Sequence, residues 1–338
     1  MKHITFILNP ISGTVSKAGI PALIEERVDR SKFTFSIEET QYAGHGTEIA
    51  AQAAYRGDDI VVAVGGDGTV NEVGKGLINT DTALGILPCG SGNGLARHLM
   101  IPMNAAKALD IINDGEIHKL DYGTINAMPF FCTCGMGFDA FISMKFAEAG
   151  KRGLVTYVQK VLEETARYKP ETYEIVDNDG TSHYKAFLIS VANASQYGNN
   201  AFIAPQASMS DGLLNVIIME PFDALEAPQV ALELFNKTLD KNTKIKTFKT
   251  ESILIHRSEP GLIHFDGDPK MTGADVEIRV HKDGINGVVN KNANTAARRP
   301  NALQTAFSEG FYDIDRLRSS VVAQGRRLQD VVRRTLQI

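Results

Sequence analysis

Short apolar runs alternate with amphipathic stretches over the first third of the chain. The runs at residues 4–8, 60–64 and 84–87 are rich in β-branched or aliphatic side chains, which is typical of strands covered on both faces of a sheet. Stretches with apolar side chains at helical spacing follow them, at residues 18–28, 47–55, 70–77 and 104–113. The alternation predicts an α/β domain over residues 1–120, built on a doubly wound parallel sheet.

The pattern changes after residue 120. Segments that resemble strands joined by turns then predominate, at residues 119–142, 171–192, 213–219, 251–257, 262–266 and 274–281. Helical spacing interrupts them only near residues 151–168 and 224–240. Residues 121–289 are therefore predicted to form a second, mostly antiparallel domain of the β-sandwich type.

The last part of the chain, residues 290–338, differs from both domains. A polar linker over residues 290–302 precedes apolar side chains at alternating three- and four-residue steps, with arginines on the other faces. From residue 291 onward there are nine basic and four acidic side chains, which predicts a basic amphipathic helical tail. Three uses of this helix remain open: docking on the protein's own body, formation of a homodimer, and attachment to an anionic membrane surface.

The composition is that of a globular protein without a nucleic-acid signature. Hydrophobic residues make up 43% and charged residues 22% of the 338 residues, and the net charge is −5. The three cysteines, Cys89, Cys132 and Cys134, form neither a disulfide framework nor a four-ligand zinc site. No window reaches the roughly 18 consecutive apolar residues that a transmembrane helix needs. We therefore predict a cytoplasmic protein that binds no nucleic acid and contacts the inner membrane face only peripherally.

Glycine-rich loops follow two of the predicted strands and carry the strongest chemical signal. Residues 65–69 (Gly-Gly-Asp-Gly-Thr) come directly after the strand at 60–64, and residues 90–93 (Gly-Ser-Gly-Asn) follow the strand at 84–87. Backbone amides at such strand-to-helix turns can approach phosphate oxygens closely. An aspartate inside the first loop is repelled by bare phosphate, unless a magnesium ion or its water lies between them.

The two glycine loops are expected to lie side by side, because the carboxyl ends of parallel strands meet at one edge of a sheet. The turn at residues 9–13 (Asn-Pro-Ile-Ser-Gly), which follows the first strand, joins them there. The chain contains neither a Gly-x-x-x-x-Gly-Lys-Ser/Thr phosphate loop nor a Gly-x-Gly-x-x-Gly fingerprint. The loops thus indicate a phosphate site of another type.

Taken in order along the chain, these motifs resemble the diacylglycerol kinase catalytic family, which includes sphingosine kinases, ceramide kinase and bacterial lipid kinases. The resemblance rests on residues 9–13, residues 65–72 (Gly-Gly-Asp-Gly-Thr-Val-Asn-Glu) and residues 87–93 (Leu-Pro-Cys-Gly-Ser-Gly-Asn). It continues at residues 135–139, 210–213 and 265–268. NAD kinases and phosphofructokinases share the Gly-Gly-Asp-Gly-Thr element, so the resemblance implies an α/β domain of their kind.

An ATP site between the two domains, with a magnesium ion, is what the resemblance implies. The residues that match the nucleotide-holding positions of the family are Asn9, Pro10, Ser12, Gly13, Thr40, Gly65, Gly66, Asp67, Gly68, Thr69, Asn71, Glu72, Gly90, Ser91 and Asn93. Gly94 stands where many bacterial members carry a second acidic residue.

Two aspartates are candidates for the catalytic base. Asp268 stands where the family usually has the glutamate of Asp-Gly-Glu, which resembles a general base for the lipid hydroxyl. An aspartate is one methylene shorter, so either the backbone sits closer to the substrate or a water intervenes. Asp67 is the competing base, and would otherwise orient the water shell of the metal. For Asp268, an ordinary Asp-Gly turn is the structural alternative.

Two further sites rest on the same resemblance. Asp139 is predicted to face the lipid head group, with a helix cap as the alternative. Asp211 resembles an aspartate of a structural magnesium site in the bacterial lipid kinases, where Ser208 and Leu213 are the neighbouring candidate ligands. An Asp-Gly turn between strands is the alternative reading of Asp211.

The sequence thus predicts an ATP-dependent lipid kinase that transfers the γ-phosphoryl group to a hydroxyl of diacylglycerol or of a sphingoid base. Its expected partner is a lipid substrate at the membrane surface. Two rival functions stay open: a kinase with a soluble acceptor, similar to NAD kinase, and a nucleotide- or lipid-sensing module without catalysis.

Overall fold

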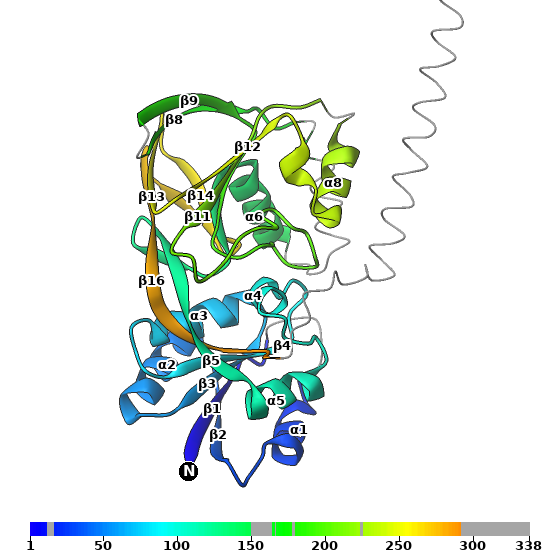
Figure 1. Ribbon diagram of the computed structural model, residues 1–338, viewed down its shortest axis with the longest axis vertical. Coiled ribbons are helices and arrows are strands. Elements are labelled where there is room, and N and C mark those ends of the chain that lie inside the picture. Colours follow the sequence, from blue (N-terminus) through cyan, green and yellow to red (C-terminus); the bar gives the residue numbers. More distant parts are fainter. Residues whose placement is uncertain (12–16, 150–163, 166, 178–179, 224–225, 292–338) are drawn as a thin grey trace, which may run out of the picture.

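The computed structural model describes residues 1–11, 17–149, 164–165, 167–177, 180–223 and 226–291 of the chain. This part forms two lobes, an α/β domain and a β-sandwich, stacked along the long axis of the molecule (Figure 1). The predicted basic tail lies outside the described residues, as does nearly all of the helix predicted near residues 151–168.

Four parallel strands form the sheet of the α/β domain, in the order β2-β1-β3-β4. They are β1 (Lys2–Leu8), β2 (Phe33–Glu39), β3 (Ile60–Gly65) and β4 (Ala83–Pro88). Every residue of β3 and β4 is buried, because helices cover both faces of the sheet. The predicted doubly wound parallel sheet is therefore confirmed.

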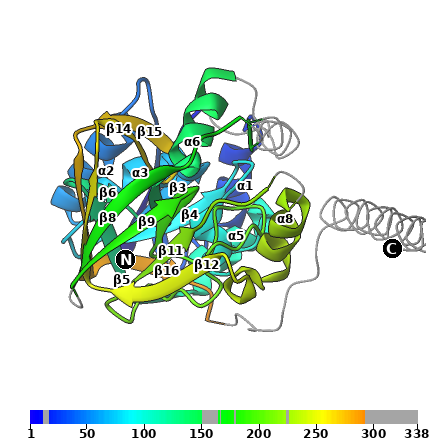
Figure 2. The same cartoon turned by 90° about the horizontal axis from the view of Figure 1, so that it is seen from above.

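Helices on the two faces of this sheet complete the domain. They are α1 (Ile20–Arg27), α2 (His45–Arg56), α3 (Asp67–Leu77), α4 (Gly94–His98) and α5 (Ala105–Asp114). α1 packs against α5 on one face, and α2 packs against α3 on the other (Figures 1 and 2). Their apolar sides meet the strands in one hydrophobic core, which includes Phe6, Ile49, Val62, Val73 and Leu109.

A six-stranded antiparallel sheet forms one half of the second domain, in the order β12-β11-β10-β7-β14-β15. Its strands are β7 (Thr133–Gly137), β10 (Leu188–Ala192), β11 (Leu214–Met219), β12 (Ile245–Thr250), β14 (Gly261–Phe265) and β15 (Asp268–Thr272). The pattern of the sequence predicted four of these strands but missed β12 and β15, both of which are mostly polar.

The other half of the sandwich is continuous with the parallel sheet of the α/β domain. Its strands are β5 (Glu116–Ile125), β6 (Met128–Phe130), β8 (Glu171–Asp177), β9 (Gly180–Ala186), β13 (Ser252–Arg257) and β16 (Asp275–Val289). The last strand, β16, pairs antiparallel with β13 in the second domain and then parallel with β4, where Asn286 faces Ala83. The predicted domain boundary at residue 120 falls inside β5, which follows β16 through both lobes.

Apolar side chains from both sheets meet in the core of the sandwich. Along β13 and over residues 275–280 of β16, buried positions alternate with more accessible ones, as expected for strands with one face on the core. Ile255 and Ile278 from one sheet share this core with Met136, Val216 and Ile263 from the other. The second domain is thus the predicted antiparallel sandwich.

Two α-helices and a 3-10 turn flank the sandwich in the described part: α6 (Phe138–Ala149), α8 (Ala227–Asn236) and η1 (Leu239–Lys241). The expectation of strand structure up to residue 142 was wrong, because the chain turns into α6 at Phe138. Apolar side chains lie on most sides of the first turns of α6, so the sequence shows no clear helical periodicity there. Among the helices of the described ranges, none combines the length and the apolar composition that a membrane span requires.

Candidate active site

The carboxyl ends of β1, β2 and β3 lie together at the edge of the α/β domain that faces the sandwich. The backbone N–H of Asn9, just after β1, donates to the carbonyl of Val64 near the end of β3, at 3.3 Å. The N–H of Thr40, just after β2, donates to the carbonyl of Leu8 at 2.9 Å, and the Thr40 side chain is buried. The sheet edge thus gathers the first turn and Thr40 beside the strand that carries the first glycine loop.

The two glycine loops touch each other through their backbones. A Cβ atom on Gly90 would lie 2.5 Å from the Cα of Gly66, and one on Gly66 would lie 3.1 Å from the Cα of Gly90. The N–H of Cys89 also donates to the carbonyl of Gly65, at 2.8 Å. Glycine is required at Gly90 because any side chain would push the loops apart.

Asp67 joins the two loops. Its carboxylate accepts the backbone N–H of Asn93 at 2.9 Å and that of Gly94 at 2.6 Å. Burial raises the pKa of Asp67, and the nearby charge of Asp266 adds to this effect, while the two amides act against it. Both carboxylate oxygens of Asp67 therefore hold the second loop in place.

The second loop is closed by the side chain of Asn93. Its Oδ1 accepts the N–H of Gly90 at 3.0 Å, and its Nδ2 donates to the carbonyl of Gly90 at 2.8 Å. Asn93 has a φ of 51°, in the left-handed region that asparagine tolerates better than most residues. Ser91 lies within this loop with a half-buried side chain.

The first turn of α3 leaves room for a ligand. Gly68 is exposed, and a Cβ atom on it would have no neighbour within 4 Å. The first N–H groups of a helix have no partner within the helix, and the helix dipole favours negative charge there. Thr69, by contrast, is buried, and its Oγ1 would lie 2.3 Å from a Cβ atom on Gly65. The residues at this helix start therefore fit an anionic group such as a phosphate.

Asn71 connects α3 to the second domain. Its Nδ2 donates to Oδ2 of Asp266 at 2.8 Å and to the carbonyl of Pro129 at 3.2 Å. The carboxylate of Asp266 also accepts the backbone N–H groups of residues 131, 132 and 133, at 2.8, 2.8 and 3.1 Å. Burial raises the pKa of Asp266, and these N–H donors act against the rise.

Asp268 lies two residues after Asp266, which is held by these hydrogen bonds. Asp266 and Gly267 both have positive φ angles, of 47° and 90°, and form the two-residue turn between β14 and β15. Asp268 is the first residue of β15, and its side chain is open to solvent. Desolvation by the surrounding protein raises the pKa of Asp268, the charges of Asp266 and Glu72 raise it further, and that of Lys75 lowers it.

Glu72 organises the start of α2. Its Oε1 accepts the N–H of Gly44 at 3.0 Å and its Oε2 accepts the N–H of Gly46 at 3.2 Å, so the carboxylate caps the helix. The hydroxyl of Thr47 donates to the carbonyl of Glu72 at 2.8 Å. Glu72 thereby fixes the segment after Thr40 against α3, which is a structural role that its motif alone did not indicate.

The first turn is described only in part. Asn9 Oδ1 accepts the N–H of Ile11 at 3.2 Å, and Pro10 is exposed. Ser12 and Gly13 lie outside the described residues. The buried ammonium group of Lys17 donates to the carbonyl of Asn9. Lys17 is a charged residue of this edge that sequence reasoning missed, since a single lysine after a turn carries no motif.

Asp139 lies away from solvent, in the first turn of α6. One of its oxygens, Oδ2, accepts the hydroxyl of Tyr197 at 2.9 Å and lies 2.9 Å from Nε2 of His264. The side chains of Asp139 and His264 are 6% and 2% exposed, respectively. The prediction that Asp139 faces a lipid head group remains a prediction, and the described contacts of its carboxylate are all internal.

Asp211, one of the candidate metal residues, is paired with a lysine. Asp211 Oδ1 accepts the N–H of Leu213 at 3.1 Å, and its Oδ2 pairs with the ammonium group of Lys249 at 2.7 Å. Ser208 Oγ instead contacts Ser210 Oγ at 3.3 Å. Within the described ranges, no three His, Cys, Asp or Glu side chains are arranged to hold a metal ion. The ammonium group of Lys249 lies where a cation bound to Asp211 would be expected.

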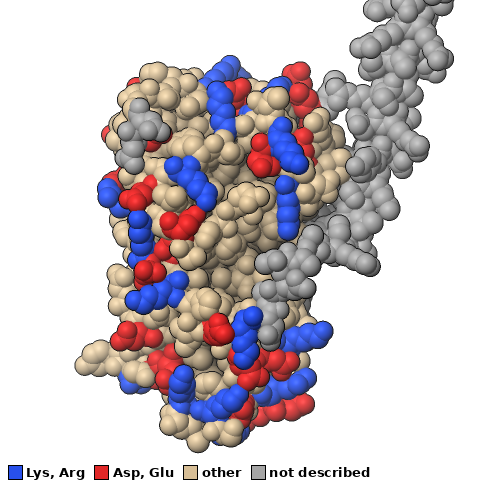
Figure 3. Space-filling view, in the orientation of Figure 1, with Lys and Arg blue, Asp and Glu red and all other residues tan. Residues whose placement is uncertain are grey.

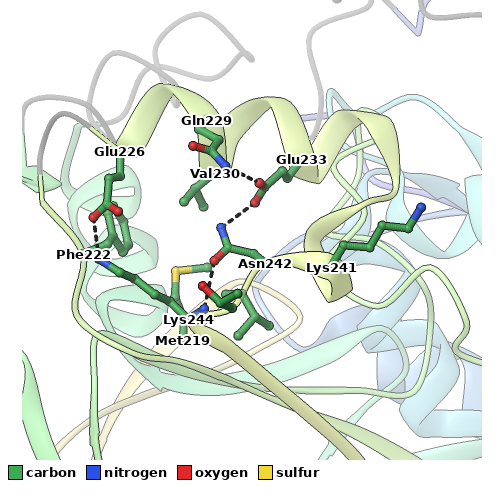
Figure 4. Close-up of a pocket in the computed structure, with 11 residues that line it drawn as sticks. Met219, Phe222, Glu226, Gln229, Val230, Glu233, Lys241, Asn242 and Lys244 are labelled. Atoms are coloured by element: carbon green, nitrogen blue, oxygen red, sulfur yellow. Dashed lines mark hydrogen bonds and ion pairs between the residues drawn. The ribbon is translucent and has the colours of Figure 1, made fainter. Parts of the chain in front are cut away.

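A separate pocket of about 210 Å³ lies between α8 and the start of β12 (Figure 4). Several of its polar side chains contact one another: Lys244 pairs with Glu226 at 2.6 Å, and Nδ2 of Asn242 donates to Glu233 at 2.7 Å. None of its lining residues belongs to the glycine loops or to the turn before Asp268. On the face of the molecule seen in Figure 3, basic and acidic side chains are interspersed, without a large patch of one sign.

Comparison with known proteins agrees with this geometry. The model of the diacylglycerol kinase catalytic domain matches residues 3–125, and that of the YegS C-terminal NAD kinase beta sandwich-like domain matches residues 133–281. A probable lipid kinase, YegS-like, of Chromohalobacter salexigens is 33% identical over 217 residues, which are 62% of this chain and 70% of that protein. A diacylglycerol kinase of Bacillus subtilis is 29% identical over 276 residues, which are 79% of this chain and 90% of the relative.

A solved structure shares the fold. The crystal structure of a diacylglycerol kinase from Bacillus anthracis superposes with a TM-score of 0.67 at 21% identity, and covers 86% of this chain and 97% of that one. The two family models follow each other along the chain as the two domains do. The chain therefore belongs to the diacylglycerol kinase catalytic family, a family of lipid kinases.

Proposed function

We propose that the protein is an ATP-dependent lipid kinase, which transfers the γ-phosphoryl group of ATP to a hydroxyl group of a lipid. The observation that carries the proposal is the meeting of both glycine loops with the Asp266–Asp268 turn at the junction of the domains. Phosphoryl transfer asks a protein mainly to position the reactants and to neutralise charge. The junction offers groups for both tasks.

The nucleotide's phosphates would lie against the start of α3. Gly68 leaves space there, and the dipole of α3 favours negative charge. Lys17, at the same sheet edge, adds a positive charge beside Asn9. When bound, Mg²⁺ would neutralise charge on the phosphates, and since it commonly keeps several waters, the carboxylate of Asp67 could accept hydrogen bonds from those waters in addition to its two backbone N–H groups. The residues present therefore fit a metal–nucleotide complex.

Asp268 is the better candidate for the base. Both oxygens of Asp67 already accept backbone N–H groups, so its carboxylate is committed to holding the second loop. Asp268 is solvent-accessible and has a raised pKa, which brings a carboxylate closer to the range in which it takes up a proton. In this assignment Asp268 accepts the proton of the lipid hydroxyl, and Asp67 orders the loop that faces the phosphates.

A lipid acceptor is supported by the names of the relatives, which are diacylglycerol kinase and lipid kinase. Diacylglycerol and sphingoid bases present a hydroxyl group at the membrane surface, so the enzyme would work in the cytoplasm in peripheral contact with the inner membrane face. The basic segment of residues 291–338 is suited to such contact by its charge, or to a homodimer by its apolar stripe.

The assay that tests the function is a panel of lipids incubated with γ-labelled ATP and Mg²⁺. We expect label in the organic phase with diacylglycerol or a sphingoid base. Label that appears only in a soluble acceptor such as NAD would support the first rival function. Binding of ATP without transfer to any acceptor would support the sensing module and would contradict the proposal.

A further inference from the structure

A buried polar network lies under the turn that carries Asp268. Asp139 Oδ2 is shared by the hydroxyl of Tyr197, at 2.9 Å, and by Nε2 of His264, at 2.9 Å. The same hydroxyl lies 3.1 Å from Oγ of Ser190, which is fully buried. Asp139 comes from α6, His264 from β14 and Ser190 from β10, so the network ties three elements together.

His264 connects this network to the turn. Its Nδ1 accepts the N–H of Gly267 at 3.4 Å, which requires that Nδ1 carries no proton. The ring proton then lies on Nε2, which faces Asp139. Nε2 is among the buried atoms of the described part that lack a hydrogen bond of good geometry, so its contact with Asp139 is a close electrostatic one. The orientation of the ring is thereby set from both of its nitrogens.

The other end of the network reaches the second glycine loop. Tyr197 belongs to a loop whose Asn199 donates its backbone N–H to the carbonyl of Gly92, at 3.1 Å. Gly198 has a φ of 116°, and a Cβ atom on it would lie 2.8 Å from the backbone of Gly92. The contacts therefore run without a break from Gly92 through Tyr197, Asp139 and His264 to Gly267.

Polar side chains in a buried position such as this one stabilise a fold less than apolar side chains do, unless their hydrogen bonds replace the lost hydration. A buried charged group such as the carboxylate of Asp139 loses the hydration of water, and its burial costs free energy unless hydrogen bonds replace that hydration. Asp139 and His264 are both nearly inaccessible. Their stabilising effect alone does not account for this choice of residues, whereas directional contacts fix relative positions in a way that apolar packing does not.

We propose that Tyr197, Asp139 and His264 are positioning residues, which hold the Gly267–Asp268 turn in register with the Gly90–Gly94 loop. The proposal rests on the proposed function in one respect: Asp268 is taken as the base and the loop as the phosphate site. A displacement of about 1 Å between reacting groups can lower a rate by about a hundredfold. The network would thus act on the chemical step and not on the binding of ATP.

Tyr197→Phe is the mildest test, because it removes only the hydroxyl that donates to Asp139. We expect kcat to fall about tenfold while the KM for ATP stays within about twofold, since the loss concerns the transition state alone. Tyr168→Phe is the matched control, because its hydroxyl also contacts a carboxylate, that of Glu171 at 3.1 Å, outside the network. A kcat for Tyr197→Phe equal to that of the control would overturn the proposal.

Two substitutions of His264 separate its two contacts. His264→Asn keeps an acceptor near Nδ1 for the N–H of Gly267, and His264→Gln keeps a donor near Nε2 for Asp139. We expect each to retain part of the kcat that His264→Ala loses. Combined with Tyr197→Phe, the loss in His264→Gln should be less than multiplicative, because both act through Asp139. Equal kcat values for all three substitutions at His264 would argue for a merely structural role.

Amide hydrogen exchange of residues 261–272 gives a readout that needs no activity. In the full chain, Tyr197→Phe should speed exchange at the turn of residues 266–268 severalfold, while Tyr168→Phe leaves it unchanged. If the wild type phosphorylates no lipid but the turn still loosens, the positioning network stands and the proposed function fails. If the wild type is active and the turn does not loosen, the network proposal fails and the function stands.

Discussion

Asn71 and Asp266 lie 195 positions apart in the sequence, and Nδ2 of Asn71 donates to Oδ2 of Asp266 at 2.8 Å. One residue belongs to the helix that starts at the first glycine loop, and the other begins the turn before Asp268. This hydrogen bond joins the candidate phosphate site to the candidate base across the domain junction. It explains how the first glycine loop and the turn of residues 266–268, which are far apart in the sequence, can work in one site.

Asn71→Ala should weaken that junction. The substitution leaves one oxygen of the Asp266 carboxylate with one donor fewer, and a buried group that loses a partner costs about 1–3 kcal/mol. We expect this loss in the free energy of unfolding, measured with denaturant, together with a lower kcat. Gln52→Ala, on an exposed position of α2, is the control and should change stability by less than about 0.5 kcal/mol. Equal stability of the two variants would contradict the role given to Asn71.

Alanine substitutions at Gly90 and Gly68 should differ in their effects on stability and on ATP binding. Gly90→Ala places a Cβ atom 2.5 Å from the backbone of Gly66, so it should destabilise the protein by about 1–3 kcal/mol. Gly68→Ala meets no protein atom within 4 Å and should leave the thermal unfolding temperature nearly unchanged. Its methyl group would point toward the space given to the phosphates, so the KM for ATP should rise several-fold. An unchanged KM would place the phosphates elsewhere.

The charge of Asp268 should cost stability at neutral pH. Its pKa in the folded protein is raised above the ordinary value of 3.8, so the folded state favours the protonated form. That preference contributes to stability below the unfolded pKa and is lost as the pH rises through the folded pKa. Asp268→Asn should therefore unfold at a higher temperature than the wild type at neutral pH, and at a similar temperature below 3.8. A pH-independent difference would contradict the raised pKa.

Asp211 is expected to keep its place without a metal ion. Lys249 already supplies a positive charge at 2.7 Å, so removal of divalent ions with EDTA should leave the unfolding temperature of the protein unchanged. Lys249→Ala should lower the free energy of unfolding by up to about 1 kcal/mol, as for other partly exposed ion pairs. If EDTA lowers the unfolding temperature and Asp211→Asn abolishes that effect, the structural metal site of the family is present here.

Much of the architecture could be predicted from the sequence, because buried parallel strands and glycine loops have strong local patterns. The β-branched strand at residues 60–64 and the loop after it lie where the pattern predicts them. The helix from Phe138 was missed, because its first turns carry apolar side chains on most sides and therefore show no helical periodicity. The return of β16 to β4 could not be predicted either, because pairing between distant strands leaves no periodic signal.

The hydrogen-bond partners of the site residues could not be predicted from the sequence, for a similar reason. A glycine-rich motif with an aspartate indicates a phosphate site, but it does not tell that Asp67 binds the amides of Asn93 and Gly94. Nor does the Asp-Gly-Asp sequence indicate that the first aspartate is half-buried and held by backbone N–H groups, while the second, Asp268, is open to solvent. Such roles depend on contacts between segments that are far apart in the chain.

The central claim is that Asp268 is the base of a lipid kinase. The most direct test measures how substitutions at Asp268 change the transfer of label from γ-labelled ATP to diacylglycerol or a sphingoid base. Asp268→Asn keeps the size of the side chain but cannot accept the proton, so kcat should fall at least about a hundredfold. Asp268→Glu, which restores the residue usual in the family, should keep kcat within about tenfold, since general bases tolerate small changes of reach through a water. Asp110→Asn, at an exposed aspartate of α5, is the control and should be fully active. Full activity of Asp268→Asn would contradict the account.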